Sequence, residues 1–380
     1  MRVAQVSCYI DPLGRGAEKL LSAWPSLADV AAAVREAGVH VSVVQAAALD
    51  EVIEQDGVSI HFVRERRAPA LRRRLGLWAS PLPRRVARRL AELRPQVVHL
   101  HGLSFPLQAR YIAGRLPNVP LLVQDHADRL PPAWRRPLHR YGLAQVGGAA
   151  FTVRDQAAPF LTAGILRPGI PVFEVMESSS RFTPGDLAEA RAATGIEGDP
   201  CLLWLGHLND NKDPLTVLDA LSRAAAELTD PRLWMCYLTA PLLELVRDRI
   251  AGDPALKGRV SLLGPRAHSE VESLLRAADF LVQGSHKEGS GYAVIEALAC
   301  GTTPLVTDIS SLRRITCGGA VGALSPPGNS LAMARALVEW SGRDRAQLRA
   351  GARAHFEREL SFAAVGRQLR AAYEAIMERA

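Results

Sequence analysis

Residues 279–308 carry the pattern that most restricts the fold of this chain. Residues 279–283 and 303–308 are short apolar runs of the kind that form buried strands. Between them, a Gly-Ser-Gly turn at 289–291 leads into an apolar helix that begins near Tyr292. A strand, a helix and a second strand in this order predict a βαβ unit with parallel strands.

Two glutamates, Glu288 and Glu296, frame this turn and helix. Gly289 and Gly291 let the backbone approach a ligand closely, and the amino end of the helix suits an anion such as a diphosphate. Apolar residues surround Glu296, so its carboxylate should be partly buried and needs a polar partner. We therefore predict a site for a sugar nucleotide, whose vicinal hydroxyls would donate hydrogen bonds to both carboxylates. The alternative is the ordinary state of glutamate, a solvated loop residue and a surface-helix residue.

A second segment, residues 202–214, has a similar organisation. A buried strand is followed by a glycine turn, a polar loop that contains Lys212, and a helix expected over 216–225. A lysine in such a loop is a point-charge ligand for phosphate. A solvated loop lysine is the alternative interpretation of Lys212.

Both segments resemble motifs of one enzyme family. Residues 288–301 resemble the E-x7-E signature of retaining glycosyltransferases with the GT-B fold, in particular glycosyltransferase family 4, also called glycosyl transferases group 1. Ser290 stands where that family commonly has Phe. Residues 202–214 are similar to the family motif G-R-L-x-x-x-K-D-P, whose Arg and Lys hold the donor diphosphate, and His207 stands at the Arg position. An imidazole is a weaker and more pH-sensitive anion ligand than a guanidinium.

The amino-terminal half adds two further likenesses. A glycine-bearing turn at 11–19 follows the first expected strand and runs into a helix. This turn is similar to the family's G-G-x-E loop, with Arg15 at the first glycine, so Gly16 is predicted to approach the donor or acceptor closely. A later strand at 121–124 ends just before His126, which by resemblance is the active-site histidine near the donor sugar and acceptor.

Two more histidines, His99 and His101, lie in the segment Q-V-V-H-L-H-G at 96–102, which is also similar to the family. A structural role, with each imidazole bonded to neighbouring backbone, fits them at least as well as a functional one. Only His101 is a candidate for lining the cleft.

Strands and helices alternate through both halves, which predicts parallel sheets. The resemblance implies an α/β protein of the GT-B fold, with two Rossmann-like domains whose parallel sheets face a cleft. We expect an acceptor-side domain over 1–177, a nucleotide-sugar-binding domain over 178–360, and a helix over 361–380 that crosses back to the first domain. The predicted strands lie at 2–8, 39–44, 59–63, 96–100, 120–124, 149–152, 201–205, 233–238, 259–263, 279–283 and 303–307.

The resemblance implies an enzyme that transfers a glycosyl group from a nucleotide-diphosphate sugar to an acceptor, with retention of configuration and without a metal or other cofactor. His126 and Glu288 are the expected catalytic residues. Two alternatives stay open: an inactive glycosyltransferase-like binding protein, which Arg15 and His207 would suit, and a sugar-nucleotide epimerase or phosphorylase on the same fold. The predicted donor-binding residues are Gly16, His207, Lys212, Glu288, Gly289, Ser290, Gly291, Tyr292 and Glu296.

Positive charge is concentrated between residues 64 and 94, where eleven arginines and two glutamates give a local charge of +9, against +7 for the whole chain. Leu, Val and Trp stand beside these arginines, as in a helix that lies on an anionic membrane surface or faces an acidic acceptor. A solvated arginine-rich helix explains the cluster equally well, and nucleic-acid binding is a disfavoured competitor. The predicted acceptor or membrane patch consists of Arg72, Arg73, Arg74, Arg84, Arg85, Arg88 and Arg89.

The composition is that of an ordinary globular protein, since 380 residues with 48% hydrophobic and 22% charged side chains suit two domains. No apolar run approaches the roughly 18 residues of a membrane span, and the amino terminus has no signal-peptide core. We therefore expect a cytoplasmic protein, with peripheral association at the inner membrane face as an extension of that prediction. Five scattered cysteines form no C-x-x-C pair and are interpreted as reduced, buried thiols.

Overall fold

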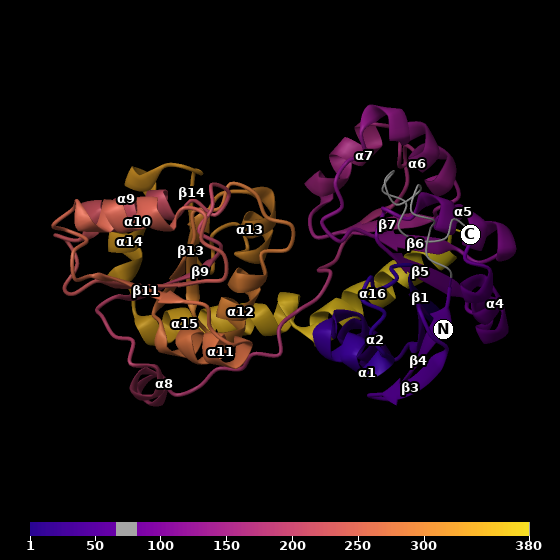
Figure 1. Ribbon diagram of the computed structural model, residues 1–380, viewed down its shortest axis with the longest axis horizontal. Coiled ribbons are helices and arrows are strands. Elements are labelled where there is room, and N and C mark those ends of the chain that lie inside the picture. Colours follow the sequence, from indigo (N-terminus) through magenta and orange to yellow (C-terminus); the bar gives the residue numbers. More distant parts are fainter. Residues whose placement is uncertain (66–81, 380) are drawn as a thin grey trace. The chain divides into compact units, whose positions relative to one another are not determined.

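The computed structural model describes residues 1–65 and 82–379. They form two compact units, one made of Met1–Ser179 with Phe362–Ala380 and the other of Ser180–Ser361 (Figure 1). Each unit has its own sheet with helices packed on it. The predicted patch residues Arg72, Arg73 and Arg74 lie outside the described residues.

The first unit contains an eight-stranded sheet in the order β3-β4-β2-β1-β5-β6-β7-β8. Its strands are parallel, except that β3 is antiparallel to β4. The central strands β5 and β6 are buried at every residue, as expected where helices cover both faces of a parallel sheet. The strands are β1 (Arg2–Ser7), β2 (His40–Ala47), β3 (Glu51–Gln55), β4 (Val58–Arg64), β5 (Val97–His101), β6 (Leu121–Gln124), β7 (Gly148–Phe151) and β8 (Val172–Glu174).

The second unit contains a six-stranded parallel sheet in the order β11-β10-β9-β12-β13-β14. The apolar run Cys201–Gly206 forms the inner strand β9 and is buried at its first five residues. The strands are β9 (Cys201–Gly206), β10 (Arg232–Tyr237), β11 (Val260–Gly264), β12 (Phe280–Val282), β13 (Thr303–Thr307) and β14 (Ala323–Ser325).

The helices begin and end where the local sequence favours it. The helix after the Gly-Ser-Gly turn, α12, is flanked by Gly291 at a φ of 60° and Gly301 at a φ of 80°, a left-handed conformation that glycine adopts without strain. The described helices of the first unit are α1 (Ala17–Ala23), α2 (Ser26–Glu36), α4 (Arg84–Leu93), α5 (Pro106–Arg115), α6 (Arg136–Leu143), α7 (Ala158–Thr162) and α16 (Phe362–Met377), with short 3-10 turns at Ala133–Arg135 and Arg154–Ala157. Those of the second unit are α8 (Leu187–Thr194), α9 (Pro214–Ala224), α10 (Leu243–Ala251), α11 (His268–Ala277), α12 (Tyr292–Cys300), α13 (Ser310–Ile315), α14 (Ser330–Ser341) and α15 (Arg345–His355), which continues into a π-helical turn at Phe356–Leu360.

The predicted fold class is confirmed, because both units are α/β with essentially parallel sheets and the carboxyl-terminal helix packs on the first unit. The sequence did not predict β3, which forms an edge hairpin with β4. Asp56 and Gly57, at φ values of 50° and 70°, make its turn, and an Asp-Gly pair between two β-prone runs is a hairpin signal. The other unpredicted strands, β8 and β14, have three residues each and lie at sheet edges.

The cysteines differ from expectation at one position. Cys8, Cys201, Cys236 and Cys300 are buried free thiols, as predicted. Cys317 is exposed, so the prediction of burial is wrong there. It lies in the turn that follows α13, with a φ of 52°, where the chain runs along the surface.

The last helix, α16, packs against α2 (Figure 1). Its buried face includes Val365, Leu369 and Tyr373, which follow the helical period. A Cβ atom at Gly366 would lie 2.2 Å from the carbonyl oxygen of Ala33, so the two helix backbones are in close contact there.

We expect Gly366→Ala to destabilise the first unit by roughly 1–3 kcal/mol, because the added methyl group would force α16 away from α2. The matched control is Gly114→Ala in α5, where a Cβ meets nothing within 4 Å. There the better helix propensity of alanine should raise stability by up to about 1 kcal/mol. Thermal unfolding followed by circular dichroism measures both. Unfolding of Gly366→Ala at the wild-type temperature would contradict the proposed close contact.

Candidate functional site

In both units, polar candidate residues gather at the carboxyl ends of the strands. In the first sheet, β1 lies between β2 and β5, where the strand order changes direction. In the second sheet, β9 has the equivalent place between β10 and β12. Ligands of open α/β sheets bind outside the strand carboxyl ends at such switch points.

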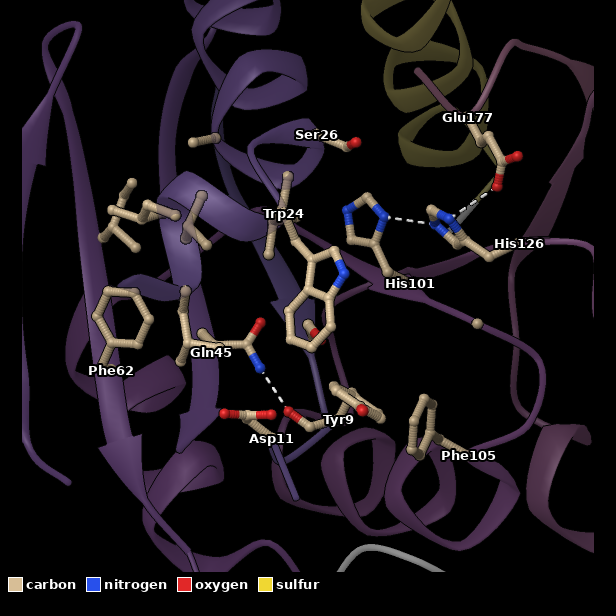
Figure 2. A pocket seen from close by; sticks show the side chains of 18 of the residues that line it. Tyr9, Asp11, Trp24, Ser26, Gln45, Phe62, His101, Phe105, His126 and Glu177 are labelled. Atoms are coloured by element: carbon tan, nitrogen blue, oxygen red, sulfur yellow. Dashed lines mark hydrogen bonds and ion pairs between the residues drawn. The ribbon is translucent and has the colours of Figure 1, made fainter. Parts of the chain in front are cut away.

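A cavity of about 510 Å³ lies at this edge of the first sheet (Figure 2). Asp11 and His101 reach it from the segments that follow or end β1 and β5, whereas Leu20, Trp24 and Phe62 give it apolar walls. Its volume is that of a small-molecule site. The cavity is formed entirely by residues of the first unit.

Three side chains form a hydrogen-bonded chain along one side of the cavity. His126 Nδ1 lies 3.0 Å from Glu177 Oε2, and His126 Nε2 lies 2.9 Å from His101 Nδ1 (Figure 2). The Glu177 carboxylate accepts the Nδ1–H of His126, so a neutral His126 keeps its Nε2 lone pair for the Nδ1–H of His101. The His126 side chain is 35% exposed and that of Glu177 only 11%, so His126 is the one that a ligand can reach.

The two histidines of β5 have different environments. Burial lowers the pKa of His101 well below its usual range and that of His99 to about 3, with neighbouring imidazoles adding to the effect, so both rings are neutral at pH 7. His99 stacks on His101 with ring centroids 4.3 Å apart, and its Nδ1 lies 2.7 Å from the hydroxyl of Tyr373 in α16. His99 is therefore a core residue, whereas His101 lines the cavity.

Two aspartates stand beside this chain. Asp128 lines the cavity, and its Oδ2 accepts the backbone N–H of Leu103 at 2.8 Å. Asp125 Oδ1 accepts the backbone N–H of Asp128 at 3.0 Å. Burial, and next the charge of Asp128, raise the pKa of Asp125 to about 6.

Gly16 lies at the amino end of α1 with a φ of −67°, and a Cβ there would meet nothing within 4 Å. Its neighbour Arg15 forms an ion pair with Asp11 at 3.0 Å, and the guanidinium carbon stands 4.3 Å above the Trp24 ring. The hydrogen bond from Arg15 lowers the pKa of Asp11 to about 2.

Lys212 and Glu288 meet in the second unit, although they are 76 residues apart. Lys212 follows β9 and Glu288 follows β12, so the adjacent parallel strands deliver them to one place. The Lys212 ammonium donates to Glu288 Oε1, and the two side chains are only 17% and 12% exposed. The lysine stem packs beside Gly206, where a Cβ would make ordinary van der Waals contact with Lys212 Cδ at 3.5 Å.

Glu296 has a partner that the sequence did not identify. His268 Nε2, at the start of α11, lies 2.8 Å from Glu296 Oε1, and the glutamate side chain is 17% exposed. Burial raises the pKa of Glu296, and the hydrogen bond from His268 opposes that effect. The carboxylate thus stays at the surface of the unit with one oxygen held in place.

The other predicted donor ligands lie around Lys212 and Glu288. Ser290 is buried, Tyr292 is 41% exposed, and Gly289 and Gly291 complete the turn that opens α12. The positive end of the α12 dipole therefore lies next to Glu288 and Lys212.

His207 also follows β9, and its Nδ1 lies 2.8 Å from the hydroxyl of Thr239. That contact orients the imidazole that stands in place of the guanidinium expected from the motif.

The arginines of α4 are on its outer surface. Val86, Ala87 and Leu90 are buried in the core of the first unit, so the apolar side of this helix is not available for insertion into a membrane. Arg84, Arg85 and Arg88 are exposed and Arg89 is half-buried. Arg85 pairs with Asp50 at 2.8 Å and Arg89 with Glu92 at 2.8 Å.

Several residues of these sites carried no local signal in the sequence. Glu177 belongs to a polar segment that reads as a domain boundary, and Trp24, Phe62 and Phe105 read as ordinary core residues. His268, which holds Glu296, stands at the end of the loop at 264–268. Over residues 1–65 and 82–379, no cluster of three or more His, Cys, Asp or Glu side chains is arranged to hold a metal ion. None of the helices in that part of the chain has the length and apolarity of a membrane span.

Comparison with known proteins adds two family matches. The model of glycosyl transferases group 1 matches residues 187–355, and that of glycosyltransferase family 4 matches residues 25–151. These ranges include the Lys212, Glu288 and Glu296 cluster and His126 respectively.

Curated relatives are similar over part of their length. The D-inositol 3-phosphate glycosyltransferase of Mycolicibacterium gilvum is 30% identical over 243 residues, which are 60% of this chain and 49% of that protein. The enzyme of the same name from Mycobacterium sp. strain KMS is 32% identical over 167 residues, which are 42% of this chain and 35% of that protein. The chain thus spans between about a third and a half of the length of these relatives.

Solved structures resemble the whole chain. A glycosyltransferase from Rickettsia africae superposes with a TM-score of 0.69 at 16% identity, covering 100% of this chain and 99% of that one. Anabaena HepE in complex with UDP and glucose superposes with a TM-score of 0.65 at 16% identity, covering 99% of this chain and 100% of that one. Identities this low establish the fold alone.

Asp125 generates a pH-dependent prediction. Because its folded pKa is raised to about 6, the folded state is most favoured where Asp125 is protonated, and that stability is lost as the pH rises through about 6. Asp125→Asn keeps an oxygen for the Asp128 N–H and carries no charge. It should therefore stabilise the protein by up to about 3 kcal/mol at pH 8 and have little effect near pH 4.

Denaturant unfolding of the wild type and the variant at both pH values measures the difference. Asp155→Asn, at an exposed carboxylate of the same unit, is the control and should show no such pH dependence. A stability gain for Asp125→Asn that is equal at both pH values would contradict the raised pKa.

Proposed function

This chain belongs to glycosyltransferase family 4, the glycosyl transferases group 1, and we propose that it transfers a glycosyl group from a nucleotide-diphosphate sugar to an acceptor hydroxyl. The observation that carries the proposal is the cluster at the carboxyl ends of β9 and β12. There a partly buried lysine, two carboxylates and the amino end of a helix stand together. A diphosphate and two sets of sugar hydroxyls would satisfy all of these groups.

The leaving diphosphate would be stabilised by the second unit. The Lys212 ammonium and the α12 amino end supply fixed positive charge where negative charge develops as the anomeric bond breaks, and such preorganised electrostatics is the main means of lowering this barrier. His207 would be an additional ligand in its protonated form. On donor binding, Lys212 would exchange its contact with Glu288 for phosphate oxygens.

The carboxylates would hold the hydroxyl groups. Glu288 would accept hydrogen bonds from the transferred sugar and Glu296 from the nucleotide ribose, which suits acceptor-only groups with one oxygen already fixed. His268 would keep Glu296 oriented and ionised. Gly289, Ser290 and Tyr292 would complete the donor site around the turn.

The acceptor would bind in the cavity of the first unit, with His126 positioning the reacting sugar and the acceptor hydroxyl. Glu177 supports this role because it fixes the ring and the tautomer of His126. We also propose retention of anomeric configuration and independence from metal ions, because the family implies both. The alternatives predict different results. An inactive binding protein would bind a nucleotide without transfer. An epimerase would consume a sugar nucleotide without an acceptor, and a phosphorylase would need free phosphate.

Titration with UDP, GDP and ADP tests the donor site through thermal stability. UDP is the first to try, because HepE is a structural relative solved with UDP and glucose. The matching nucleotide should stabilise the protein by about 2.7 kcal/mol at a concentration of 100 Kd. Glu296→Ala should reduce the stabilisation, because the ribose hydroxyls lose their acceptor.

The control for Glu296→Ala is Glu227→Ala, which removes an exposed glutamate of the same unit and should respond to the nucleotide like the wild type. His126→Ala should keep the stabilisation but lose transfer and donor hydrolysis by about 100-fold or more, because the reacting sugar and the acceptor hydroxyl lose the side chain that positions them. Full activity in His126→Ala would overturn its role. Absence of stabilisation by every nucleotide would overturn the donor site.

Peripheral binding to an anionic membrane is a separate proposal for the α4 arginines. It would be electrostatic, since the apolar side of α4 is buried and its exposed side carries Arg84, Arg85 and Arg88. Removing Arg84 and Arg88 together should weaken binding to phosphatidylserine vesicles by roughly 30-fold at low salt, at about 1 kcal/mol for each arginine.

Co-sedimentation with the vesicles measures this binding, and Arg335→Ala with Arg343→Ala, two surface arginines of the second unit, is the control. Equal binding of the two double variants would refute a role for α4.

A further inference from the structure

The floor of the first-unit cavity is largely apolar. Val43, Ile60 and Phe62 line it and are 1%, 1% and 3% exposed. A sugar ring or a phosphate placed on these side chains would leave its polar groups without partners, whereas an apolar ring or chain would lose only unfavourable contact with water. The deep part of the cavity therefore selects an apolar body.

An aromatic side chain rises in the middle of this cavity. Trp24 is 47% exposed, and Tyr9 packs against it edge to face, with ring centroids 5.7 Å apart and an interplanar angle of 84° (Figure 2). Arg15 covers one face of the indole and is itself held by Asp11. Trp24 is thus a fixed platform between the apolar side near Phe62 and the polar side near His101 and His126 (Figure 2).

The charged groups of the cavity are acidic. Among the described lining residues none is lysine or arginine, whereas Asp11, Asp128 and Glu177 are carboxylic acids. Arg15, which stands over Trp24, is paired with Asp11, while Asp128 stands on the side of His126 and His101 is neutral. A field of this sign repels an anionic ligand and attracts a cationic one.

From these three features, and resting on the proposed function, we infer that the acceptor is an uncharged or cationic amphiphile. It has an apolar or aromatic body that lies on Trp24 and Phe62, a hydroxyl that reaches His126, and no phosphate. The curated relatives of this chain are named D-inositol 3-phosphate glycosyltransferases. The cavity differs from a phosphate site, because its floor is largely apolar and Arg15, the cation that stands over Trp24, is already paired with Asp11.

The transfer step has simple stoichiometry. The acceptor oxygen forms a bond to the anomeric carbon, and the bond between that carbon and the diphosphate oxygen breaks. The nucleoside diphosphate leaves with the electron pair and takes up the proton of the acceptor hydroxyl. Glu177 keeps the His126 ring fixed, the hydroxyl would take the place of the His101 Nδ1–H at His126 Nε2, and no residue of this group gains a proton overall.

Binding of three naphthalene derivatives to the full chain tests the inference by calorimetry without nucleotide. Naphthol and naphthylmethylamine share the naphthalene body of naphthyl phosphate and differ from it in the polar group and its charge. We expect the first two to bind at least about tenfold more tightly than the phosphate, a difference of about 1.4 kcal/mol. Equal or tighter binding of naphthyl phosphate or of inositol phosphate would overturn the inference, as would no binding of naphthol.

Trp24→Ala should weaken naphthol binding by about tenfold, because the aromatic platform is lost. The control is Trp134→Ala, which removes another exposed tryptophan of the same unit, 68% exposed and outside the cavity. Equal effects of the two variants would overturn the placement of the acceptor on Trp24. Thermal unfolding and stabilisation by the nucleotide establish that each variant is folded.

A gain-of-binding variant tests the role of charge without truncation. Ser26 lines the cavity at the start of α2, so Ser26→Arg would add a cation there and should tighten naphthyl phosphate binding by at least about tenfold. Ser22→Arg adds the same charge to the exposed side of α1, outside the cavity, and should not. The same affinity for the phosphate in both variants would overturn the charge argument.

The nucleotide titration separates this inference from the proposed function. If a nucleotide stabilises the protein and transfer occurs only to phosphorylated acceptors, the inference is overturned and the glycosyltransferase proposal is left intact. Naphthol binding that depends on Trp24, without stabilisation by any nucleotide, would overturn the proposed function and leave the ligand class of the cavity.

Discussion

Both sheets of this protein are built almost entirely from parallel strands, and this constraint decides where its chemistry can lie. A connection between parallel strands crosses a face of the sheet and returns to the same end, so strand carboxyl ends and helix amino ends collect along one edge. Lys212 and Glu288, 76 residues apart, meet there because β9 and β12 are neighbours. The same geometry brings His101 and His126 together from β5 and β6.

Charged groups at these edges are partly withdrawn from water, so each depends on a partner. Glu288 has Lys212, and Glu296 has His268. Asp125 shows the consequence of burial beside a second carboxylate, since burial and the charge of Asp128 raise its pKa to about 6. Separation of a partly buried ion pair is costly unless a new partner replaces each member. A ligand that parts Lys212 from Glu288 must therefore bring both an anion and hydroxyl groups, and a nucleotide sugar has both.

The donor cluster could be predicted from the sequence because most of its residues belong to short segments with regular spacing. Glu288, the glycine turn and α12 are contiguous, and Lys212 follows one strand at a fixed distance. The cavity of the first unit could not be predicted, because Trp24, Phe62 and Glu177 come from three distant segments and resemble core or linker residues until the sheet assembles them. For α4, amphipathic spacing was correctly recognised, but spacing alone does not tell whether the apolar side meets a membrane or, as here, the protein core.

The two sites draw on different parts of the sequence, so similarity to relatives says more about the site of the second unit than about the cavity of the first. A change in the cavity of the first unit, such as a different side chain at Trp24 or Ser26, alters no contact of the Lys212 and Glu288 cluster. The walls of this cavity can therefore diverge while the Lys212 and Glu288 cluster stays constant, so identity near 30% with enzymes named for an inositol phosphate does not extend to what the cavity binds. Under the proposed function the acceptor depends on the local cavity, because a largely apolar floor and acidic lining side chains would bind a different molecule from a cavity that must neutralise a phosphate.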